Sequence, residues 1–523
     1  MKRQPASIFN DVIGPVMRGP SSSHTAAASR IGLLANQMVE GKLKKVIVEF
    51  HPKGSLATTY QGQGSDFGLV GGLLGYNTED ERLVTSIAIA KEVGLDVRFN
   101  IVEYEASHPN TYRLKMFSHK EEISATAIST GGGMIKVENI NGFTVEIAGD
   151  FYETLIFCSS NKAIQEVEDA LEKEDFEVEY IQKSSKEKEI LVNLKILKVL
   201  DESLIKRLKE IDGVLSIMNL SPVLPVLSSR DCDVPFLTAK EMLEKYENDK
   251  SLYELALLYE SIRGKITEDE VYNKMKKIVE IMNDSVRKGL SGTEYEDRIL
   301  GPQSHLIQEA MKNQKLIPGD LMNTVISYIT SMMEVKSSMG VIVAAPTAGS
   351  CGGLPGTIIG ACDSMELTID HMVKGMLAAG MIGLFIAQSA TFAAEVGGCQ
   401  VECGAGSSMA AAGLVQLMDG SAKQGVDAAS MALQNVMGMV CDPVGDRVEV
   451  PCLGKNVMAG TNAVACANMA LAGFDKVIPL DETIESMYKV GHMLPPELRC
   501  TGKGGLSVTP TGIKILEEMQ KKE

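Results

Sequence analysis

The region from residue 341 to residue 440 constrains the fold more than any other part of the sequence. It contains only nine acidic or basic residues in one hundred positions, against 23% over the whole chain, and Gly, Ala and Met dominate it. Helices that are apolar on all sides and rich in small residues pack closely on one another in the middle of a domain. The sequence therefore predicts a buried helical core in the C-terminal part of the chain.

Within this region, residues 375–394 carry no charge and are long enough to cross a bilayer. The stretch is rich in Ala and Gly and is interrupted by Gln388, Ser389 and Thr391. Neither a Trp/Tyr belt nor a basic cluster flanks it, as either would at a membrane surface. We therefore expect a central buried helix and no membrane partner.

The length and the order of patterns predict a multidomain chain, because 523 residues exceed what one hydrophobic core usually supports. Residues 1–150 mix strand-like runs with helical and glycine-rich segments, which predicts an α+β N-terminal domain. Residues 152–222 show a β-α-β-β-α-β pattern, which predicts a ferredoxin-like middle domain. After a proline-bearing linker, residues 236–523 have helical periodicity and are expected to form an all-α catalytic domain.

The charge balance and the cysteine usage limit the partners and the compartment. A net charge of -17 and a pI near 5.1 leave no basic footprint for phosphate backbones, so nucleic acid is not expected as a partner. The N-terminus lacks the apolar run of a secretory signal, which predicts a cytoplasmic protein. In that reducing compartment we expect the ten cysteines to bind metal or to be buried, and not to form disulfides.

Three cysteines are distinguished by their neighbours. Cys399 lies in EVGGCQVECGAG, Cys441 in VCDPVGD and Cys452 in EVPCLGKN, and turn residues flank each of them. Thiolates are the ligands of iron-sulfur clusters, and three ligands leave one iron of a four-iron cluster open for Lewis-acid catalysis. Spacing alone leaves two alternatives: three ordinary buried cysteines, or a metal held by Cys399 together with Cys403 on the next turn of a helix.

Several separated blocks resemble one family. AAPTAGSCGGLPG, EVGGCQVECGAGSSMAAAG, CDPVGDRVEVPCLGKN and GGLSVTPTG closely resemble the catalytic α region of the iron-sulfur-dependent L-serine dehydratases. GPSSSHTAAASRIG, GSLATTYQGQGSD, HPNT and STGGGMI resemble that family's β domain, which is similar to the allosteric substrate-binding domain of some D-3-phosphoglycerate dehydrogenases. Residues 152–222 resemble an ACT domain, a module that often senses amino acids. The resemblance covers nearly the whole chain and indicates a single-chain member.

The resemblance implies conversion of L-serine to pyruvate and ammonia without a pyridoxal cofactor. Cys399, Cys441 and Cys452, separated by forty-two and then eleven residues, match the family's ligands to a [4Fe-4S] cluster. Cys403 stands where the family commonly has an aliphatic residue and is not counted as a ligand. This chain ends without the terminal cysteine of some members, so Cys500 is kept as an alternative fourth ligand.

Two further groups of residues are expected at the site. The turn formed by Thr347, Ala348, Gly349 and Ser350 offers hydroxyls and amides suited to the substrate carboxylate, although such a turn is equally typical of a helix cap or a phosphate cradle. The SSSHT motif places His24 beside Ser22 and Ser23, and in the family the corresponding segment contributes to the interface with the catalytic region. His24 is therefore expected to shuttle a proton or to hydrogen-bond the substrate.

The general base is left open by a departure from the family. Many members have a histidine in the block that here contains Gln63, and glutamine cannot take a proton. His24, His108, Asp66 or a serine alkoxide paired with one of them are the candidates. The other possibility is that the substrate or the activity differs.

Three other functions compete with serine dehydration. An open iron would also support elimination from L-cysteine or L-threonine. A pyridoxal-dependent lyase would need a Schiff-base lysine, and neither Lys374 nor Lys455 lies in a convincing context. The ACT-like region would also suit a non-catalytic amino-acid sensor, and because such units often pair across subunits we expect a homo-oligomer.

Overall fold

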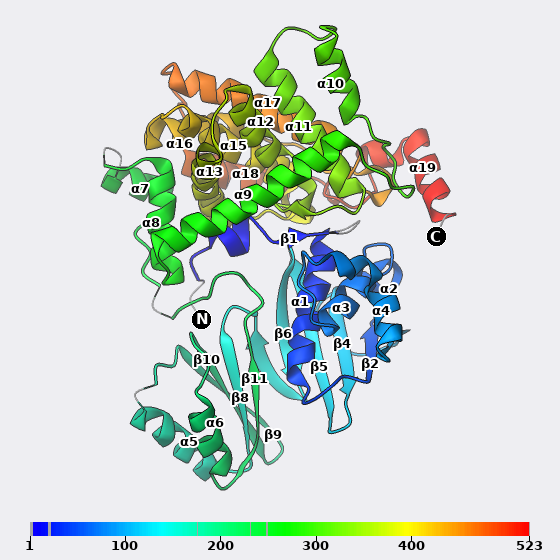
Figure 1. Ribbon diagram of the computed structural model, residues 1–523, viewed down its shortest axis with the longest axis vertical. Coiled ribbons are helices and arrows are strands. Elements are labelled where there is room, and N and C mark those ends of the chain that lie inside the picture. Colours follow the sequence, from blue (N-terminus) through cyan, green and yellow to red (C-terminus); the bar gives the residue numbers. More distant parts are fainter. Residues whose placement is uncertain (1–3, 19–21, 175, 231, 247–248, 522–523) are drawn as a thin grey trace. The chain divides into compact units, whose positions relative to one another are not determined.

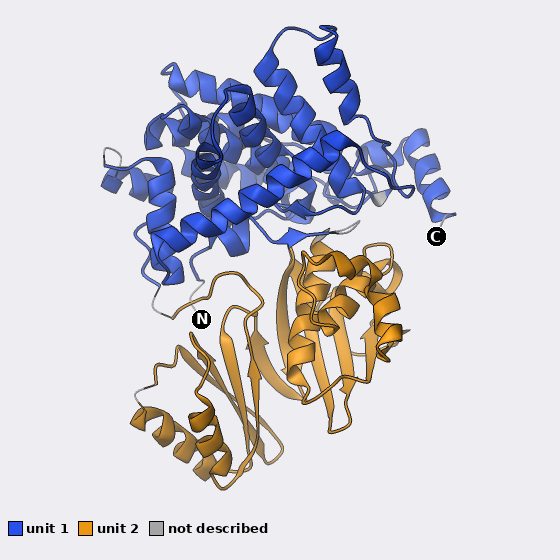
Figure 2. Cartoon of the chain, viewed as in Figure 1, with its two compact units in different colours: residues 1–21, 232–523 blue, residues 22–231 orange. Residues whose placement is uncertain are grey.

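The chain folds into two compact units, shown in different colours in Figure 2. The structure, a computed structural model, describes residues 4–18, 22–174, 176–230, 232–246 and 249–521. Residues 22–231 form the first unit, called here the β-rich unit. Residues 1–21 and 232–523 form the second, called the helical unit.

A six-stranded sheet forms one half of the β-rich unit (Figure 1), with the strand order β3-β2-β4-β5-β6-β7. β2 and β3 are parallel, and the other neighbours are antiparallel. The strands are β2 (Lys45–Phe50), β3 (Asp96–Ile101), β4 (Thr111–Phe117), β5 (Glu122–Gly131), β6 (Met134–Ile140) and β7 (Phe143–Ile147). The helical segments of this half are α1 (Ser22–Met38), α2 (Leu56–Thr59), α3 (Ser65–Leu73), η2 (Glu81–Thr85) and α4 (Ser86–Glu92).

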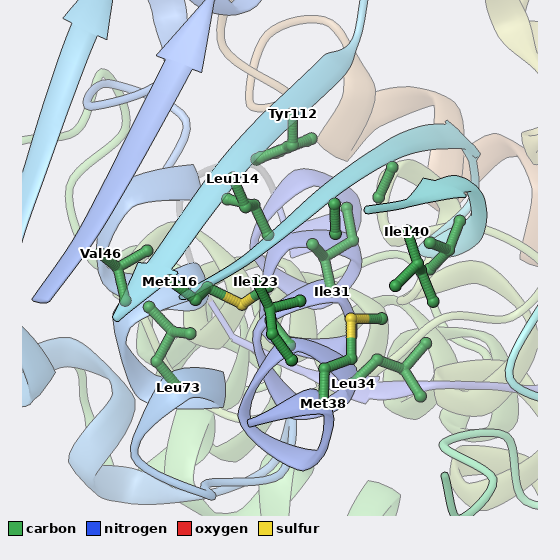
Figure 3. Packing of buried hydrophobic residues seen from close by; sticks show 14 of the residues in the cluster. Ile31, Leu34, Met38, Val46, Leu73, Tyr112, Leu114, Met116, Ile123 and Ile140 are labelled. Carbon is green, nitrogen blue, oxygen red and sulfur yellow. The ribbon is translucent and has the colours of Figure 1, made fainter. Parts of the chain in front are cut away.

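The core of this half lies between α1 and the sheet. Figure 3 shows Ile31, Leu34 and Met38 of α1 packed with Ile123 and Met116 of the sheet, and all five are almost fully buried. These α1 residues recur at the three- and four-residue spacing that places side chains on one face of a helix. The segment that begins with the SSSHT motif is thus held against the sheet by its own apolar stripe.

Glycines let α1 and α3 approach at backbone distance. A Cβ atom at Gly72 would lie 2.1 Å from the Ser29 carbonyl oxygen, and one at Gly32 would lie 2.3 Å from the Leu69 oxygen. No other residue fits at these two positions without moving a helix. The contact holds the middle of α1 against the C-terminal half of α3.

The second half of the β-rich unit is a four-stranded antiparallel sheet with the order β11-β8-β10-β9. Its elements are β8 (Tyr152–Cys158), α5 (Asn161–Lys173), β9 (Tyr180–Lys186), β10 (Glu189–Ile196), α6 (Glu202–Glu210) and β11 (Val214–Leu220). They follow in the β-α-β-β-α-β order expected from the sequence. Ile156, Val192 and Leu194 face α5 and α6 and share a buried cluster with Ile164 and Leu208.

The two sheets share one hydrophobic core. On the face of the second sheet that α5 and α6 leave uncovered, Leu155, Phe157 and Leu191 join the same cluster as Phe143 of β7. The rings of Phe143 and Phe157 lie 5.5 Å apart in an edge-to-face arrangement. Apolar side chains from both sheets interdigitate here, so the two halves form one compact unit.

The helical unit contains thirteen described α-helices (Figure 1). They are α7 (Ala239–Tyr246), α8 (Leu252–Gly264), α9 (Glu268–Ser291), α10 (Ser304–Lys312), α11 (Asp320–Ser337), α12 (Gly353–Ser364), α13 (Ile369–Ser389), α14 (Ala394–Gly397), α15 (Cys403–Leu417), α16 (Ala422–Asn435), α17 (Cys452–Leu471), α18 (Leu480–Met493) and α19 (Pro510–Gln520). α13 is long and apolar enough to cross a membrane, but 78% of its apolar window is buried inside the protein. α15 is buried along its whole length. Both helices come from the stretch of low charge and have the pattern of core helices.

The N-terminal segment belongs to the helical unit, which differs from the predicted domain of residues 1–150. It contains the π-helix η1 (Ile8–Val12) and the strand β1 (Val16–Met17), which pairs with β12 (Ile342–Val343). The physical reason is its apolar content: Ile8, Val12 and Met17 are fully buried. The unit predicted to be all-helical therefore also contains a two-residue antiparallel ladder. The division of the chain at residues 152, 222 and 236 stays a prediction.

Candidate metal centre and active site

Cysteines from separate segments come together in the helical unit. Cys399 begins η4 (Cys399–Val401), and its thiol contacts the thiols of Cys403, at the start of α15, and of Cys441. The Cys441 thiol also contacts that of Cys500. Two backbone hydrogen bonds hold this pair of loops together: Cys441 N donates to the Leu498 oxygen at 2.8 Å, and Cys500 N donates to the Cys441 oxygen at 2.9 Å. All the described cysteines are free.

These contacts favour a thiolate at Cys399. Hydrogen bonds from the Cys403 and Cys441 thiols lower the pKa of Cys399 well below its ordinary value. The Lys455 ammonium acts in the same direction, with its Nζ atom 3.8 Å from the Cys399 Sγ atom. The hydrogen bond to Cys399 raises the pKa of Cys403 and of Cys441. A thiolate is the form of cysteine that binds metal.

A possible set of metal ligands includes one residue that is not a cysteine. The sulfurs of Cys399 and Cys441 and one carboxylate oxygen of Glu402 all lie within 4.8 Å of one another. Cys452, at the start of α17, lies within electrostatic range of the same group, because the charge of Cys399 adds to burial in raising the pKa of Cys452. The structure thus brings Cys399 and Cys441 together with Glu402, whereas the Cys452 sulfur is not part of the group within 4.8 Å, and its assignment as a ligand stays a prediction. The chemistry of these donors fits a metal group bound through thiolate.

The predicted substrate loop lies against this group. Ala348, Gly349 and Ser350 form the short helix η3 (Ala348–Ser350), and Thr347 precedes it. The Thr347 hydroxyl donates to Glu402 Oε1 at 2.8 Å, which connects the loop to the thiol region. The Thr347 amide donates to Ser350 Oγ at 3.2 Å, so the turn also caps its own helix, one of the alternatives left open by the sequence.

Asn456 fixes the other side of this loop from α17. Its fully buried amide nitrogen donates to the Gly349 oxygen and to the Cys452 oxygen, both at 2.8 Å. Its oxygen accepts from the Gly353 amide at 2.8 Å. One side chain therefore joins the loop, the start of α12 and the helix turn that begins with Cys452.

Glu402 and Asn456 were not identified by sequence reasoning. Burial raises the pKa of Glu402 well above its ordinary value, and the negative charge of Cys399 acts in the same direction. A signal for Glu402 was present, because it is one of nine charged residues in residues 341–440 and an acidic group inside an apolar region needs partners. Asn456 had no comparable signal, because an amide in a helix is common.

The other predicted residues lie in the β-rich unit. The Thr25 hydroxyl donates to the Gln63 oxygen at 3.2 Å, which brings the SSSHT motif beside the block that contains Asp66. Burial lowers the pKa of His24 and raises the pKa of Asp66. Ser23 is partly buried on α1, and the side chain of Ser22 lies outside the described part of the chain.

His108 has a local structural partner. Its Nδ1 atom accepts a hydrogen bond from the Asn110 amide at 3.1 Å within the HPNT turn. The thiols lie in the helical unit, whereas His24, Asp66 and His108 lie in the β-rich unit. The catalytic assignment of Ser22, Ser23 and His24 therefore stays a prediction.

Comparison with known protein families finds two matches along this chain. Residues 167–507 match the family described as serine dehydratase alpha chain, and residues 11–140 match the family described as serine dehydratase beta chain. The chain belongs to the serine dehydratase family. The thiols, Glu402 and the loop of residues 347–350 all lie within the alpha-chain match.

Individual relatives agree with this assignment to the serine dehydratases. The chain is 36% identical over 288 residues to the probable L-serine dehydratase alpha chain of Bacillus subtilis (strain 168), covering 55% of this chain and 95% of the relative. It is 34% identical over 219 residues to the probable beta chain of the same organism, covering 41% of this chain and 98% of the relative. It is 26% identical over 518 residues to the L-serine dehydratase of Helicobacter pylori, covering 94% of this chain and 96% of the relative. Serine dehydratase alpha and beta regions are thus joined here in one chain.

Proposed function

We propose that this protein is an L-serine dehydratase that forms pyruvate and ammonia with a [4Fe-4S] cluster held by Cys399, Cys441 and Cys452. The central observation is that the Cys399 and Cys441 sulfurs and the Glu402 carboxylate lie within 4.8 Å of one another. The Thr347 hydroxyl is bonded to the same carboxylate. A sulfur site for metal and a loop suited to a small anionic substrate are therefore adjacent.

The reaction needs assistance at two atoms of serine. Hydroxide is a poor leaving group, and the proton on Cα is weakly acidic. A [4Fe-4S] cluster with three cysteine ligands would supply Lewis acidity to the leaving oxygen. The chain itself must bind the carboxylate and the ammonium group, and must accept the Cα proton.

The loop of Thr347, Ala348, Gly349 and Ser350 would bind the substrate carboxylate through its amides and hydroxyls. Glu402 orients this loop by accepting the Thr347 hydroxyl, and its carboxylate would pair with the substrate ammonium. Asn456 holds the Gly349 carbonyl in place from the opposite side. We assign proton abstraction to His24 with Ser22 and Ser23, and keep Asp66 and His108 as alternatives.

The surroundings of Lys455 favour this chemistry over a pyridoxal reaction. Its Nζ atom donates to Asp442 Oδ1 at 2.7 Å and to the Val440 oxygen at 2.6 Å, and it lies beside the Cys399 sulfur. A Schiff-base lysine would have to leave all three partners. Next to a thiolate, the same ammonium favours the charged sulfur that a metal requires.

The test is anaerobic reconstitution with iron and sulfide, followed by assays of metal content and of pyruvate and ammonia released from L-serine. We expect a brown, oxygen-sensitive and active protein. Cys399→Ala, Cys441→Ala and Cys452→Ala should each lose iron and activity together. The matched controls Cys158→Ala, in the β-rich unit, and Cys362→Ala, on α12, are also buried cysteines and should keep both.

Other results of this experiment would contradict the proposal. A reconstituted protein that is colourless and inert would favour the non-catalytic sensor. Faster turnover of L-cysteine or L-threonine than of L-serine would replace the substrate and keep the site. Loss of iron from Cys403→Ala or Cys500→Ala, with iron retained in Cys452→Ala, would assign the third ligand differently.

The second sheet is proposed to be an ACT-like domain of residues 152–222, and the protein a homo-oligomer. Its β-α-β-β-α-β order with four antiparallel strands supports the first part. Because this sheet shares a core with the first one, deletion is a poor test. Titration of the whole protein with amino acids, followed by calorimetry and light scattering, would detect a bound effector and the subunit number. Absence of binding by every amino acid except the substrate would reject the sensing role.

A further inference from the structure

The N-terminal residues 4–18, called here the strap, are bound to the helical unit by several independent contacts. Figure 1 draws this segment in dark blue among the helices of that unit, and Figure 2 gives it the colour of the same unit. Ile8, Phe9, Val12, Ile13 and Met17 are each at most 1% exposed. A short segment with this many buried apolar side chains binds as a peptide ligand would.

The seat of the strap on α13 is made by glycines. A Cβ atom at Gly383 would lie 2.1 Å from Val12 Cγ1, and one at Gly380 would lie 2.9 Å from Ile8 Cγ2. These two glycines are one turn apart and form a shallow groove in which the branched side chains of η1 lie. The position of the strap on α13 therefore depends on the branched side chains of η1 and on the lack of side chains at the two glycines.

A buried carboxylate on α8 anchors the first turn of the strap. Glu260 is fully buried and accepts from Ser7 Oγ at 2.5 Å and from the Ile8 amide at 2.8 Å. Two more bonds come from the same helix: the Tyr259 hydroxyl donates to the Ala6 oxygen at 3.1 Å, and Arg263 donates to the Pro5 oxygen at 3.3 Å. Four hydrogen bonds to one helix therefore hold residues 5–8 of the strap.

The far end of the strap leads directly to the substrate loop. The Gly14 amide donates to the Ala344 oxygen at 2.9 Å, and the Ala344 amide donates to the Pro15 oxygen at 3.2 Å. β1 then pairs with β12, with Val16 opposite Val343. Ala344 is three residues before Thr347, so the strap fixes the strand from which the loop of Thr347 to Ser350 begins.

We propose that the strap is a positioning segment for the substrate loop. Residues 11–18 fall within the match to the beta-chain family, yet they pack in the unit that contains the alpha-chain site. A segment that matches the beta-chain family therefore supports a loop that matches the alpha-chain family. The inference rests on the proposed function for its kinetic consequence, whereas its structural consequence can be measured without turnover.

Gly383→Ala in the full chain tests this positioning role. The new methyl group takes up space that Val12 occupies, while the amino acids of the strap and of the loop stay the same. We expect faster hydrogen exchange at residues 4–18 and 344–350, with iron content unchanged. kcat/KM for L-serine should fall by about 10- to 100-fold, mainly through KM. The control Gly301→Ala has no atom within 4 Å of the new Cβ and should change none of these quantities.

A compensating substitution separates positioning from general loss of stability. Val12→Ala removes the methyl group that the new Cβ meets most closely, and the other two atoms it meets, Met409 Cε at 3.1 Å and Sδ at 3.2 Å, are the end of a flexible side chain. The double variant Gly383→Ala/Val12→Ala should therefore regain protection at residues 344–350 and a KM near that of the wild type. Faster exchange in the strap alone, with protection of the loop and KM unchanged, would overturn the inference. Loss of iron together with the strap would also overturn it, because the strap would then support the thiols.

Cleavage of the chain directly after the strap is a second test of its positioning role. A protease site introduced at residues 19–21 leaves the rest of the chain joined through residues 231 and 232. We expect the cleaved strap to remain bound through size-exclusion chromatography, with hydrogen-exchange protection at residues 344–350 unchanged. Release of the strap without any change in loop exchange would count against the proposal. If wild-type protein fails to dehydrate L-serine, the proposed function fails, and the exchange and retention measurements still decide the role of the strap.

Discussion

At the scale of single residues, Glu402 has the most unusual environment of the candidate site. It is an acidic residue in a stretch dominated by Gly, Ala and Met, it lies beside two cysteine sulfurs, and it accepts the Thr347 hydroxyl. Burial and the charge of Cys399 raise its pKa. An acidic group in this position is costly unless it binds a partner, which supports a direct role in orienting the loop and the substrate.

Glu402→Gln is expected to reduce kcat/KM for L-serine by about 100-fold or more, because an amide of the same shape cannot ionise to pair with the substrate ammonium. Iron and sulfide content should stay unchanged, since the cysteines are proposed to hold the cluster. Steady-state kinetics and metal analysis of the reconstituted protein measure both. The control Glu395→Gln changes an exposed carboxylate in the same segment and should leave both unaffected. Loss of iron in Glu402→Gln would identify this residue as a ligand.

At the scale of elements, the sequence predicted whether a segment is a helix or a strand better than it predicted which segments pair with each other. Alternating apolar residues predicted the strands of the second sheet, and the low charge of residues 341–440 predicted α13 and α15. The pairing of β1 with β12 joins residues more than three hundred positions apart and was not predicted. A two-residue strand is too short to show an alternating pattern, and neither segment has a local feature that identifies its pairing partner. Glu402 was missed although it is close to Cys399 and Cys403 in sequence, because the sequence does not show that its side chain lies beside the Cys441 sulfur and Thr347.

One buried pair in the second sheet allows a quantitative test at this scale. Glu153 on β8 and Lys195 on β10 are direct cross-strand partners, with Nζ 2.6 Å from Oε1 and side chains 1% and 5% exposed. Burial raises the pKa of Glu153 to about 7. Each group therefore depends on the other, because either charge alone would be left in an apolar interior.

Glu153→Leu alone is expected to lower the free energy of unfolding by about 3 to 5 kcal/mol, whereas Glu153→Leu/Lys195→Met should lie within about 1 kcal/mol of the wild type. The reason is that the single change leaves an unpaired buried charge and the double change leaves none. Thermal unfolding at pH 7 of the four proteins in the cycle gives the coupling. The cycle for Lys183 and Glu168, a more exposed pair in the same half, is the control and should show little coupling. Additive effects at Glu153 and Lys195 would contradict the prediction.

At the scale of the whole molecule, shared hydrophobic cores define the compact units, and the blocks into which the sequence pattern divides do not. The sequence divides naturally at about residue 151, where the β-α-β-β-α-β pattern starts, and this suggested separate domains. In the structure, Leu155, Phe157 and Leu191 of the second sheet belong to the same cluster as the side chains of the first sheet in Figure 3. Sequence reasoning identified strand-like runs in the first half and the β-α-β-β-α-β order of the second, but had no means of knowing that both faces of the central strands β8 and β10 are buried.

Phe157→Ala tests whether this core is shared. Truncation of a buried Phe costs about 3 to 5 kcal/mol, and this ring lies edge-to-face with Phe143 at 5.5 Å. Because the cavity would border both sheets, hydrogen exchange should become faster in β7 of the first sheet as well as in β8 and β10 of the second. The control Val199→Ala changes a side chain that is 55% exposed in the same half and should alter neither. Faster exchange confined to residues 152–220 would mean that the second sheet is energetically independent, as separate domains would be.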